Sequence, residues 1–299
     1  MTPTDRVAAS VAAASGATTS DAPGPPRGRA DLHIHTMASD GTASVPEILE
    51  AVEAAGFLDV IAIADHERID AAVAARAMAR DRGLRVEVVV GEEVTTRGGH
   101  LLALFLETTI RPYRSLRATI AAVHDAGGLA IPAHPLVPYP LCAQGFVLRR
   151  LLEDPDPNVH PDGLETLNPT MLGRPAHGRA TRFADEFGLA HLGNSDAHAL
   201  EAIGTGWTSF PGRSADELRR AIEARTTEHG GSFHDTTGQL SVFRRQLRKR
   251  GRDARDEVGG RLRRDGTGRD HGYPGGRARP PRYAPGDHQA TPDPVEGSR

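Results

Sequence analysis

The sequence predicts an α/β domain whose strands close into a barrel. Between residues 30 and 225, short apolar or β-branched runs alternate with longer amphipathic segments, as strands and helices do in this fold class. Runs such as Val60-Ile61-Ala62-Ile63 are apolar throughout, which is typical of parallel strands covered on both faces. Seven or eight such runs favour a closed barrel over an open sheet. In a barrel, reactive side chains lie where strands end and loops begin.

Each expected strand is one of these runs, and each expected helix has a start signal or an apolar period. Strands are expected over residues 32–35, 60–64, 86–90, 101–106, 129–133, 163–167, 190–193 and 207–210. Ser44 with Glu47, and Ser214 with Glu217, have capping-box spacing, so helices are expected to begin there. Further helices are expected over residues 70–82, 113–126, 146–152 and 175–187. The segment 136–162 could be an insertion that roofs a pocket, or a long structural loop.

The two flanks differ in composition from this domain, which is expected to span residues 30–230. Residues 1–29 are rich in small residues and proline, and they lack the compact apolar run of a secretory signal, so a disordered leader is expected. Residues 231–299 are basic and rich in Gly and Pro, and most of this tail is also expected to be disordered. Its arginines, from Arg244 onward, could contact nucleic acid or anionic lipid. Interspersed acidic residues make a solvated tail the stronger interpretation.

Composition excludes several classes of protein. The single cysteine, Cys142, rules out an internal disulfide and a Cys-based metal site, and it favours a cytoplasmic location. Cys142 lies in a Pro-rich segment away from any base motif, so a structural role is expected. No run approaches the roughly 20 apolar residues that a membrane span needs. The net charge of −3 gives no global indication of nucleic-acid binding, and no protein partner is predicted.

Two histidines at the first expected strand indicate a metal site. His33 and His35 flank an apolar residue, and side chains in a strand alternate between faces, so the two imidazoles should point the same way. A second pair, Asp196 and His198, repeats this spacing near the other end of the domain. The centre is therefore expected to form from segments distant in the chain.

Histidines at other strand ends extend this pattern. Six of the 14 histidines lie at strand ends, namely His33, His35, His66, His100, His134 and His198. A lone histidine in such a place is usually a hydrogen-bonded structural residue. Six of them, interleaved with Asp40, Glu93 and Asp196, make that interpretation weak. Imidazole and carboxylate ligands without thiolate suit Zn, Mn or Fe, and several ions are needed to occupy so many ligands.

These residues resemble the motifs of the polymerase and histidinol phosphatase (PHP) domain family. The matching pieces are Asp31-Leu-His33-Ile-His35, Ser39-Asp40-Gly41, Ala64-Asp65-His66, Gly91-Glu-Glu93, His100, Ala133-His134-Pro135 and Ser195-Asp196-Ala197-His198. The resemblance covers residues 30–225. Within the family, the chain is similar to stand-alone bacterial members, which act as phosphoesterases on nucleotides or short oligonucleotides. It implies a distorted TIM-like barrel of seven strand-helix units, (β/α)7, with two or three divalent metal ions.

The resemblance also implies how the ligands divide. The three sets are His33, His35, Glu93 and Asp196 for one ion, Glu93, His100 and His134 for a second, and Asp40, His66 and His198 for a third. Glu93 rather than Glu92 matches the family's Gly-x-Glu spacing. Asp31 and Asp65 are expected to orient histidines rather than to bind metal. Ala64 departs from the Thr common in the family, which removes a hydroxyl but no ligand.

The chemistry expected of such a centre is hydrolysis of a phosphate ester. Clustered dications supply hydroxide at neutral pH and neutralise charge on the phosphoryl oxygens. Arg174 could grip a substrate phosphate in two places, or could pair with a surface carboxylate, and with Asp65 it completes the candidate catalytic residues. His177 could reach the pocket, although a solvated helical histidine is the simpler interpretation. The substrate would be a nucleotide, a nucleoside bisphosphate, a short oligonucleotide or a small phosphomonoester.

Two other functions fit the same residues. An amidohydrolase-like C–N hydrolase also uses His-x-His in a barrel, but Asp65-His66, Glu93 and the pair Asp196 and His198 favour phosphoester chemistry. A metal-stabilised nucleotide-binding module without turnover is the third possibility. Every expected type of ligand is present, which argues against loss of activity.

Overall fold

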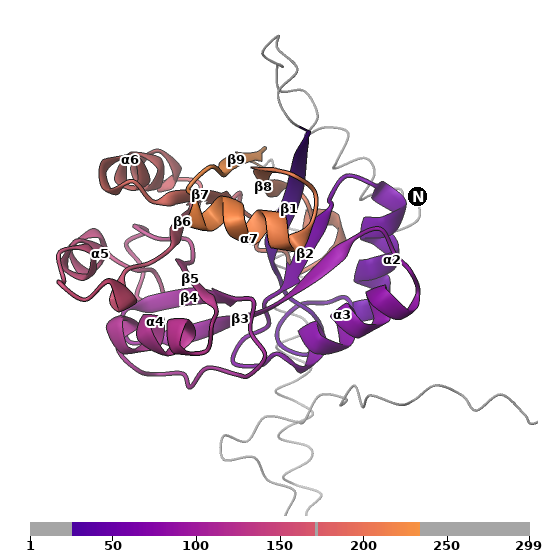
Figure 1. The fold of residues 1–299 in the computed structure, drawn as a ribbon, viewed down its shortest axis with the longest axis horizontal. Coiled ribbons are helices and arrows are strands. Elements are labelled where there is room, and N and C mark those ends of the chain that lie inside the picture. Colours follow the sequence, from indigo (N-terminus) through magenta and orange to yellow (C-terminus); the bar gives the residue numbers. More distant parts are fainter. Residues whose placement is uncertain (1–25, 171–172, 234–299) are drawn as a thin grey trace, which may run out of the picture.

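The computed structural model describes residues 26–170 and 173–233 of the chain (Figure 1). Nearly all of the expected leader and tail, including the Arg-rich stretch, lies outside the described residues. The strands are β1 (Arg27–Ile34), β2 (Val60–Ile63), β3 (Glu87–Thr96), β4 (Gly99–Leu104), β5 (Leu129–Pro132), β6 (Gly163–Leu167), β7 (Ala190–Gly193), β8 (Gly206–Pro211) and β9 (Glu228–Gly231). The helices are α2 (Val45–Ala55), α3 (Asp70–Asp81), α4 (Leu116–Asp125), α5 (Gly145–Leu152), α6 (His177–Phe187) and α7 (Ala215–Glu223), with short 3-10 turns η1 (Pro157–Val159) and η2 (Leu200–Ala202).

The expected strands and helices are all present, and most of their ends lie within three residues of those expected; β1 and β3 are longer, and β9 is an additional strand. β1 begins at Arg27, inside the segment expected to be disordered, because its first residues pair with β8. β3 continues past Val90 through two glutamates to Thr96, since both of those side chains are buried rather than solvated. β9 was not expected, because a run of Glu, His and two glycines has no apolar period.

The strands form a mixed sheet rather than the parallel one expected. The order is β5-β4-β3-β2-β1-β8-β9, and a separate pair is formed by β6 and β7. The prediction of parallel pairing is right for β1-β2-β3 and for β6-β7, and wrong for β3-β4-β5 and β1-β8-β9, which are antiparallel. The reason at β3-β4 is a tight turn at residues 97–98, which can join only antiparallel neighbours.

The sheet curls into a half-barrel, and the pair β6-β7 lies across its opening (Figure 1). In the described part of the chain no strand ladder crosses either seam. At one seam the backbone N–H of Asp162 donates to Ala130 O at 3.0 Å. At the other, the Thr208 hydroxyl bonds to the backbone of Gly193. A complete (β/α)7 barrel therefore stays a prediction.

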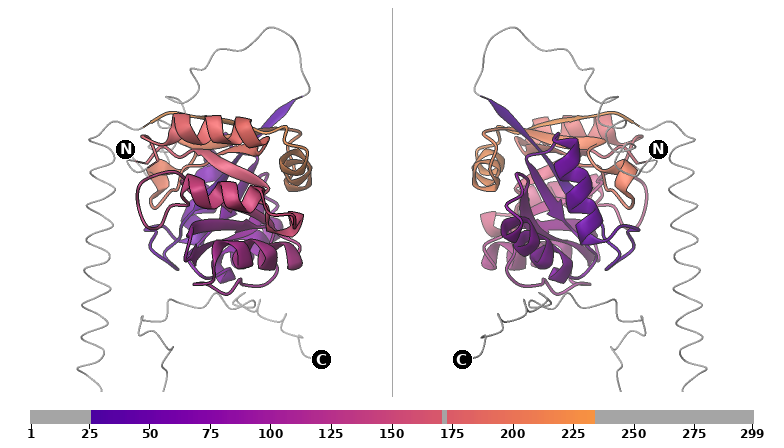
Figure 2. Two further views of the ribbon diagram at one scale, coloured as in Figure 1. Left: turned by 90° about the vertical axis from the view of Figure 1, so that its left-hand side faces the viewer. Right: turned by 90° about the vertical axis from the view of Figure 1, so that its right-hand side faces the viewer.

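Helices cover the outside of this sheet and enclose its core. In Figure 2, α4, α5 and α6 lie on one side of the molecule, while α2 and α3 lie on the opposite side. Helix α2 begins with the expected capping box of Ser44 and Glu47 and ends at Gly56, whose φ of 63° suits a residue without a Cβ. Helix α7 repeats the box with Ser214. Its apolar face packs into one buried cluster with Phe210 and side chains of the inner strands.

Candidate metal centre

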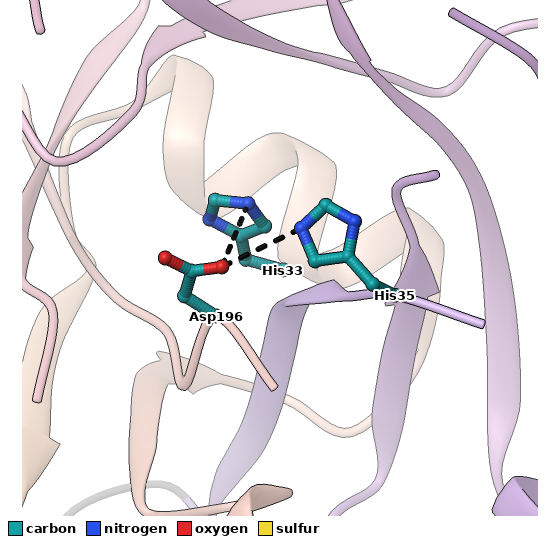
Figure 3. A group of neighbouring side chains, drawn as sticks. All are labelled: His33, His35 and Asp196. Carbon is teal, nitrogen blue, oxygen red and sulfur yellow. Dashed lines mark ion pairs between the residues drawn. The ribbon is translucent and has the colours of Figure 1, made fainter. Parts of the chain in front are cut away.

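The two histidines of the first motif point into one buried space, as their spacing predicts. His33 lies in β1 and His35 directly after it, and both rings face the carboxylate of Asp196, which follows β7 (Figure 3). His33 Nε2 lies 3.5 Å from Asp196 Oδ1, and His35 Nε2 lies 3.4 Å from the same oxygen. Each nitrogen also lies 3.3 Å from Oε2 of Glu93 in β3.

The distances between the imidazole nitrogens and the carboxylate oxygens of this group suit ligands of one metal ion. A regular tetrahedron whose vertices lie about 2.0–2.2 Å from its centre, as for Zn with N and O ligands, has edges of about 3.3–3.6 Å. The four N···O distances of 3.3–3.5 Å lie in that range. Three of the four donors expected for the first ion, His33, His35 and Asp196, form one compact set of potential ligands, and Glu93 lies beside both imidazoles.

The ring nitrogens of this group support the same conclusion. His33 Nε2, His35 Nδ1 and His35 Nε2 are fully buried and have no aligned hydrogen-bond partner, although carboxylate oxygens lie close by. A buried polar atom without a partner costs about 1–3 kcal/mol and needs an explanation. A metal ion requires ring nitrogens that lie around a common centre. Such nitrogens need not be aligned for hydrogen bonds with the neighbouring oxygens.

Glu93 also reaches a second group of imidazoles. Its Oε1 lies 2.8 Å from His100 Nδ1 and 3.2 Å from His134 Nε2, while its Oε2 faces the first group. His66 approaches from β2, with Nδ1 3.4 Å from Glu93 Oε2. His66, Glu93 and His100 form one compact set of potential ligands. The carboxylate of Glu93 therefore has the position of a bridge.

Asp40 gathers the third group. Its Oδ1 lies 3.2 Å from His198 Nε2, 3.6 Å from His35 Nδ1 and 3.8 Å from His66 Nε2. His35, Asp40 and His66 form a compact set here, so His35 and His66 each face two of the three groups through their two ring nitrogens. All nine expected ligand residues thus lie in one cluster, but the partition among ions is less sharp than the motifs imply.

Charge within the cluster is strongly coupled. Burial opposes protonation of His35, but Asp196 and Glu93 outweigh it and raise its pKa to about 10. Burial likewise disfavours the ionised form of Asp196, yet His33 and His35 hold the pKa of this carboxyl well below its usual range. The carboxylates are therefore ionised and demand positive charge. Divalent cations could provide that charge in place of imidazole protons.

Glu165 in β6 is a carboxylate whose role the sequence did not reveal. Its Oε1 lies 3.0 Å from His33 Nδ1, which fixes the ring so that Nε2 faces the centre. Its Oε2 accepts the backbone N–H of His134 at 2.6 Å. Asn168 and Asn194 both donate to the same carboxylate. The two asparagines could have been found from the sequence, because each is a polar residue directly after a strand, Asn168 after β6 and Asn194 after β7.

Asp31 and Asp65 have partners other than the expected histidine rings. Asp31 accepts the backbone N–H groups of Ser195 and Gly204 at 3.0 and 2.9 Å, and burial raises its pKa to about 6. Asp65 accepts from Thr36 N at 2.8 Å and from the hydroxyl of Ser39. Each carboxylate therefore holds the backbone of a loop that carries ligands.

Cys142 is closer to the centre than its place in the sequence indicates. Its Sγ lies 3.3 Å from Nδ1 of His134, and the thiol is buried. The expectation that it lies away from any base is wrong, because residues 136–143 fold back so that Leu136 N bonds to Ala143 O.

Two of the expected ligand residues have a strained backbone. His134 has φ 31° and Asp196 has φ 52°, conformations that cost energy and that cluster at functional sites.

Arg174 lies against an aromatic ring. Its guanidinium carbon is 5.5 Å from the ring centroid of Phe233, and its side chain is exposed. His177, at the start of α6, donates from Nδ1 to Thr166 O at 2.8 Å and also contacts Phe233. The phosphate-gripping role expected for Arg174 stays a prediction.

The curled sheet and the buried cluster of histidines and carboxylates define an α/β protein with a candidate multinuclear metal centre. Residues 31–139 match the family model of the PHP domain, and residues 174–227 match that of the PHP-associated segment. The chain belongs to the PHP domain family. In the described part of the chain, no helix combines the length and apolar character that crossing a membrane requires.

Known proteins that are similar to this chain include the following three. An uncharacterized protein of Methanocaldococcus jannaschii is 36% identical over 121 residues, which are 37% of this chain and 69% of that protein. A 5'-3' exoribonuclease of Haemophilus influenzae is 35% identical over 83 residues, 26% of this chain and 29% of that enzyme. A two-domain protein of Bacteroides vulgatus, with a predicted PHP-like metal-dependent phosphoesterase, superposes with a TM-score of 0.58 at 18% identity, covering 77% of this chain and 72% of that one. The last likeness concerns the fold alone.

Proposed function

We propose that this protein hydrolyses phosphate esters at a centre of two or three divalent metal ions. The observation that carries the proposal is the convergence of His33 Nε2 and His35 Nε2 on Glu93 and Asp196, without aligned hydrogen bonds. The proposed ligands are His33, His35, Asp40, His66, Glu93, His100, His134, Asp196 and His198. The donors are imidazoles and carboxylates, which suit Zn, Mn or Fe.

The proposed assignment of ions follows the motif sets. His33, His35, Glu93 and Asp196 would hold one ion. Glu93 would bridge to a second, and its contacts with His100 and His134 support this. The third set would be built on Asp40, and its short distance to His198 supports it. The ions would lower the pKa of bound water and offset charge on the phosphoryl oxygens.

The residues around these ligands would hold them in place. Glu165 fixes the tautomer and orientation of His33, and loss of such a partner typically weakens metal affinity by about 10–100-fold. Asp65 holds the loop that presents Asp40 through Thr36 and Ser39. We assign Asp65 this positioning role. Arg174 remains the candidate for gripping a substrate phosphate.

The proposed substrate is a nucleotide, a nucleoside bisphosphate, a short oligonucleotide or a small phosphomonoester. The exoribonuclease of Haemophilus influenzae, which acts on RNA by its name, supports the nucleic-acid end of this range. We propose residues 30–230 as the phosphoesterase domain. A cytoplasmic location stays a prediction from the single cysteine.

The test compares metal-loaded and metal-free protein on p-nitrophenyl phosphate and a panel of nucleotides, with Mn or Zn added and the bound metal measured. The variant His33→Ala removes a proposed ligand, and His191→Ala removes a half-buried histidine outside the cluster. We expect turnover that needs metal, is lost in His33→Ala and is retained in His191→Ala. Equal rates in all samples, or turnover of cyclic amides without turnover of phosphate esters, would contradict the proposal.

A further inference from the structure

A cavity of about 500 Å³ lies beside the turn that joins β3 to β4. Its walls include the side chains of Arg97, Arg111, Tyr113 and Arg114, together with Ser115 and Ala118 at the N-terminus of α4. None of these residues belongs to the proposed metal centre. The cavity is therefore separate from the metal centre.

This cavity, which we call the arginine pocket, lies close to the metal centre along β3. Arg97 follows Glu93 by four residues, so their Cα atoms lie at most about 13 Å apart, the span of four fully extended residues. Thr95 lies between them and pairs with His100, and its hydroxyl lies 3.5 Å from His100 Nε2. A chain-like substrate could therefore contact both places at once.

The backbone of the pocket is held by hydrogen bonds. Ile110 N donates to Glu92 Oε2 at 2.8 Å, and Tyr113 N donates to Thr95 O at 2.7 Å. Arg97 N donates to Arg114 O at 2.8 Å, which sets these two arginines side by side. The segment 110–115 is thus fastened to β3 at several points, so the pocket is formed before any ligand arrives.

The guanidinium groups of the pocket have no ion-pair partner among the residues that the structure describes. Many other arginines have one, such as Arg76 with Glu107 and Arg149 with Glu186. Three like charges around one cavity repel each other, and an anion would relieve that repulsion. The N-terminus of α4 adds a favourable dipole for negative charge. Arginine forks also match phosphate geometry.

Tyr113 adds an aromatic surface to this charge. Its side chain is 64% exposed, which is high for a large apolar ring, and its φ of 61° is uncommon for a residue other than glycine. The hydrogen bond from its N–H to Thr95 O holds it in this conformation. Exposed aromatic rings beside positive charge are the elements that bind single-stranded nucleic acid, by stacking on bases and pairing with phosphates.

We infer that the arginine pocket binds a single-stranded nucleic-acid segment that flanks the phosphate at the metal centre. The arginines would contact backbone phosphates and Tyr113 would stack on a base. This inference rests on the proposed function and narrows it, because a substrate that spans both places must be an oligonucleotide rather than a small phosphomonoester. An acidic peptide is a ligand of another class, and the test below distinguishes its binding from that of an oligonucleotide.

The test measures binding of a fluorescein-labelled short single-stranded oligonucleotide to the full chain at several salt concentrations. The double variant Arg97→Gln/Arg114→Gln removes two charges, and Arg82→Gln is a control in which an exposed arginine outside the pocket is removed. We expect the double variant to bind about tenfold or more weakly, with the slope of log affinity against log salt smaller by about 1.4. Tyr113→Ala should weaken binding roughly fivefold or more, and Tyr113→Phe should not.

Hydrolysis of p-nitrophenyl phosphate is measured in parallel, because this ester is too small to reach the pocket. We expect its rate to be unchanged in all four variants. Oligonucleotide binding by the double variant equal to that of Arg82→Gln would overturn the inference, as would equally tight pocket-dependent binding of a polyglutamate peptide. Absence of ester hydrolysis in the wild type would instead count against the proposed function, while the binding data would still decide the pocket.

Discussion

The described part of the chain contains two clusters of histidines, and they differ in the carboxylates that surround them. In the metal centre, imidazoles alternate with carboxylates, and ring nitrogens of His33 and His35 lack aligned partners. The second cluster comprises His177, His191 and His229. The ring centroid of His229 lies 5.0 Å from that of His177 and 5.9 Å from that of His191. Among the described residues, its nitrogens do not form a compact ligand set.

The surroundings of the two clusters explain the difference. In the second cluster, His177 Nδ1 lies 2.8 Å from Thr166 O, and His229 Nδ1 lies 2.9 Å from the hydroxyl of the same residue. Among the residues that the structure places, its one carboxylate contact joins His191 to the exposed Asp185. Burial and the two other histidines lower the pKa of His229 to about 4, whereas that of His35 is raised to about 10. Buried carboxylates, rather than histidines, therefore distinguish a metal site here.

The largest effect should come from removing the central carboxylate of the metal cluster. Asp196→Asn takes away a charge that faces His33 and His35, and we expect the rate of phosphate-ester hydrolysis to fall at least about a hundredfold. The matched variant is Asp185→Asn, which removes the aspartate beside His191. Its rate should stay within about twofold of the wild type. Similar losses in both variants would remove the distinction between the clusters.

A smaller effect is expected from the carboxylate behind His33. Glu165→Gln replaces the acceptor of His33 Nδ1 with an amide, and metal affinity should fall by about 10–100-fold. The adjacent change Thr166→Val removes the hydroxyl that contacts His229. Metal titration followed by calorimetry should show no comparable loss in that control. An unchanged affinity in Glu165→Gln would show that His33 needs no orienting partner.

Metal removal should lower the stability of the whole domain. A ligand at 100 times its Kd stabilises the folded state by about 2.7 kcal/mol, which for a domain of this size is about 5–10 °C in Tm. We expect a chelator to lower the Tm of the wild type by this amount and to leave Asp196→Asn almost unchanged. Scanning calorimetry with and without the metal provides the measurement. A chelator effect of the same size in both proteins would place the stabilising ion elsewhere.

The smallest effect concerns pH and the second cluster. His229 is faced by His177, His191, Asp185 and Thr166, and its pKa of about 4 lies below the 6.5 of an unfolded histidine. Protons therefore bind preferentially to the unfolded chain between these values, so stability falls as pH decreases from about 6.5 to 4. His229 is partly exposed, and solvent screening reduces its contribution. We therefore expect the free energy of unfolding to fall by about 1–2 kcal/mol over this pH range.

The matched measurement uses the variant His229→Gln, which lacks the titrating ring. Urea unfolding at several pH values should show a shallower loss of stability below pH 6.5 in this variant than in the wild type. Identical slopes would mean that His229 titrates normally in the folded protein.

Much of the candidate site could be predicted because the chemistry is local to short motifs. The His-x-His spacing at His33 and His35 places both rings on one face of any strand, whatever the rest of the chain does. The pair Asp65-His66 follows the apolar run Val60-Ile61-Ala62-Ile63, which predicts a buried strand. For the same reason, the helix starts at Ser44 and Ser214 were correctly expected.

Other features depend on contacts between distant segments, which local patterns do not contain. Glu165 orients His33 across 132 residues of sequence, and Cys142 reaches His134 only because its loop folds back. The continuation of β3 through Glu92 and Glu93 looked like a loop, because the partners that allow their burial lie elsewhere in the chain.

The sequence by itself determined which residues carry the chemistry and that strands present them, since alternation and capping act over a few residues. Only the tertiary structure decided that β4, β5 and β8 run antiparallel to their neighbours, that Glu93 faces two groups of ligands, and that three arginines share one pocket. The physical reason is that strand pairing, burial and electrostatic coupling are set by distances in space, which a linear pattern of residues does not specify.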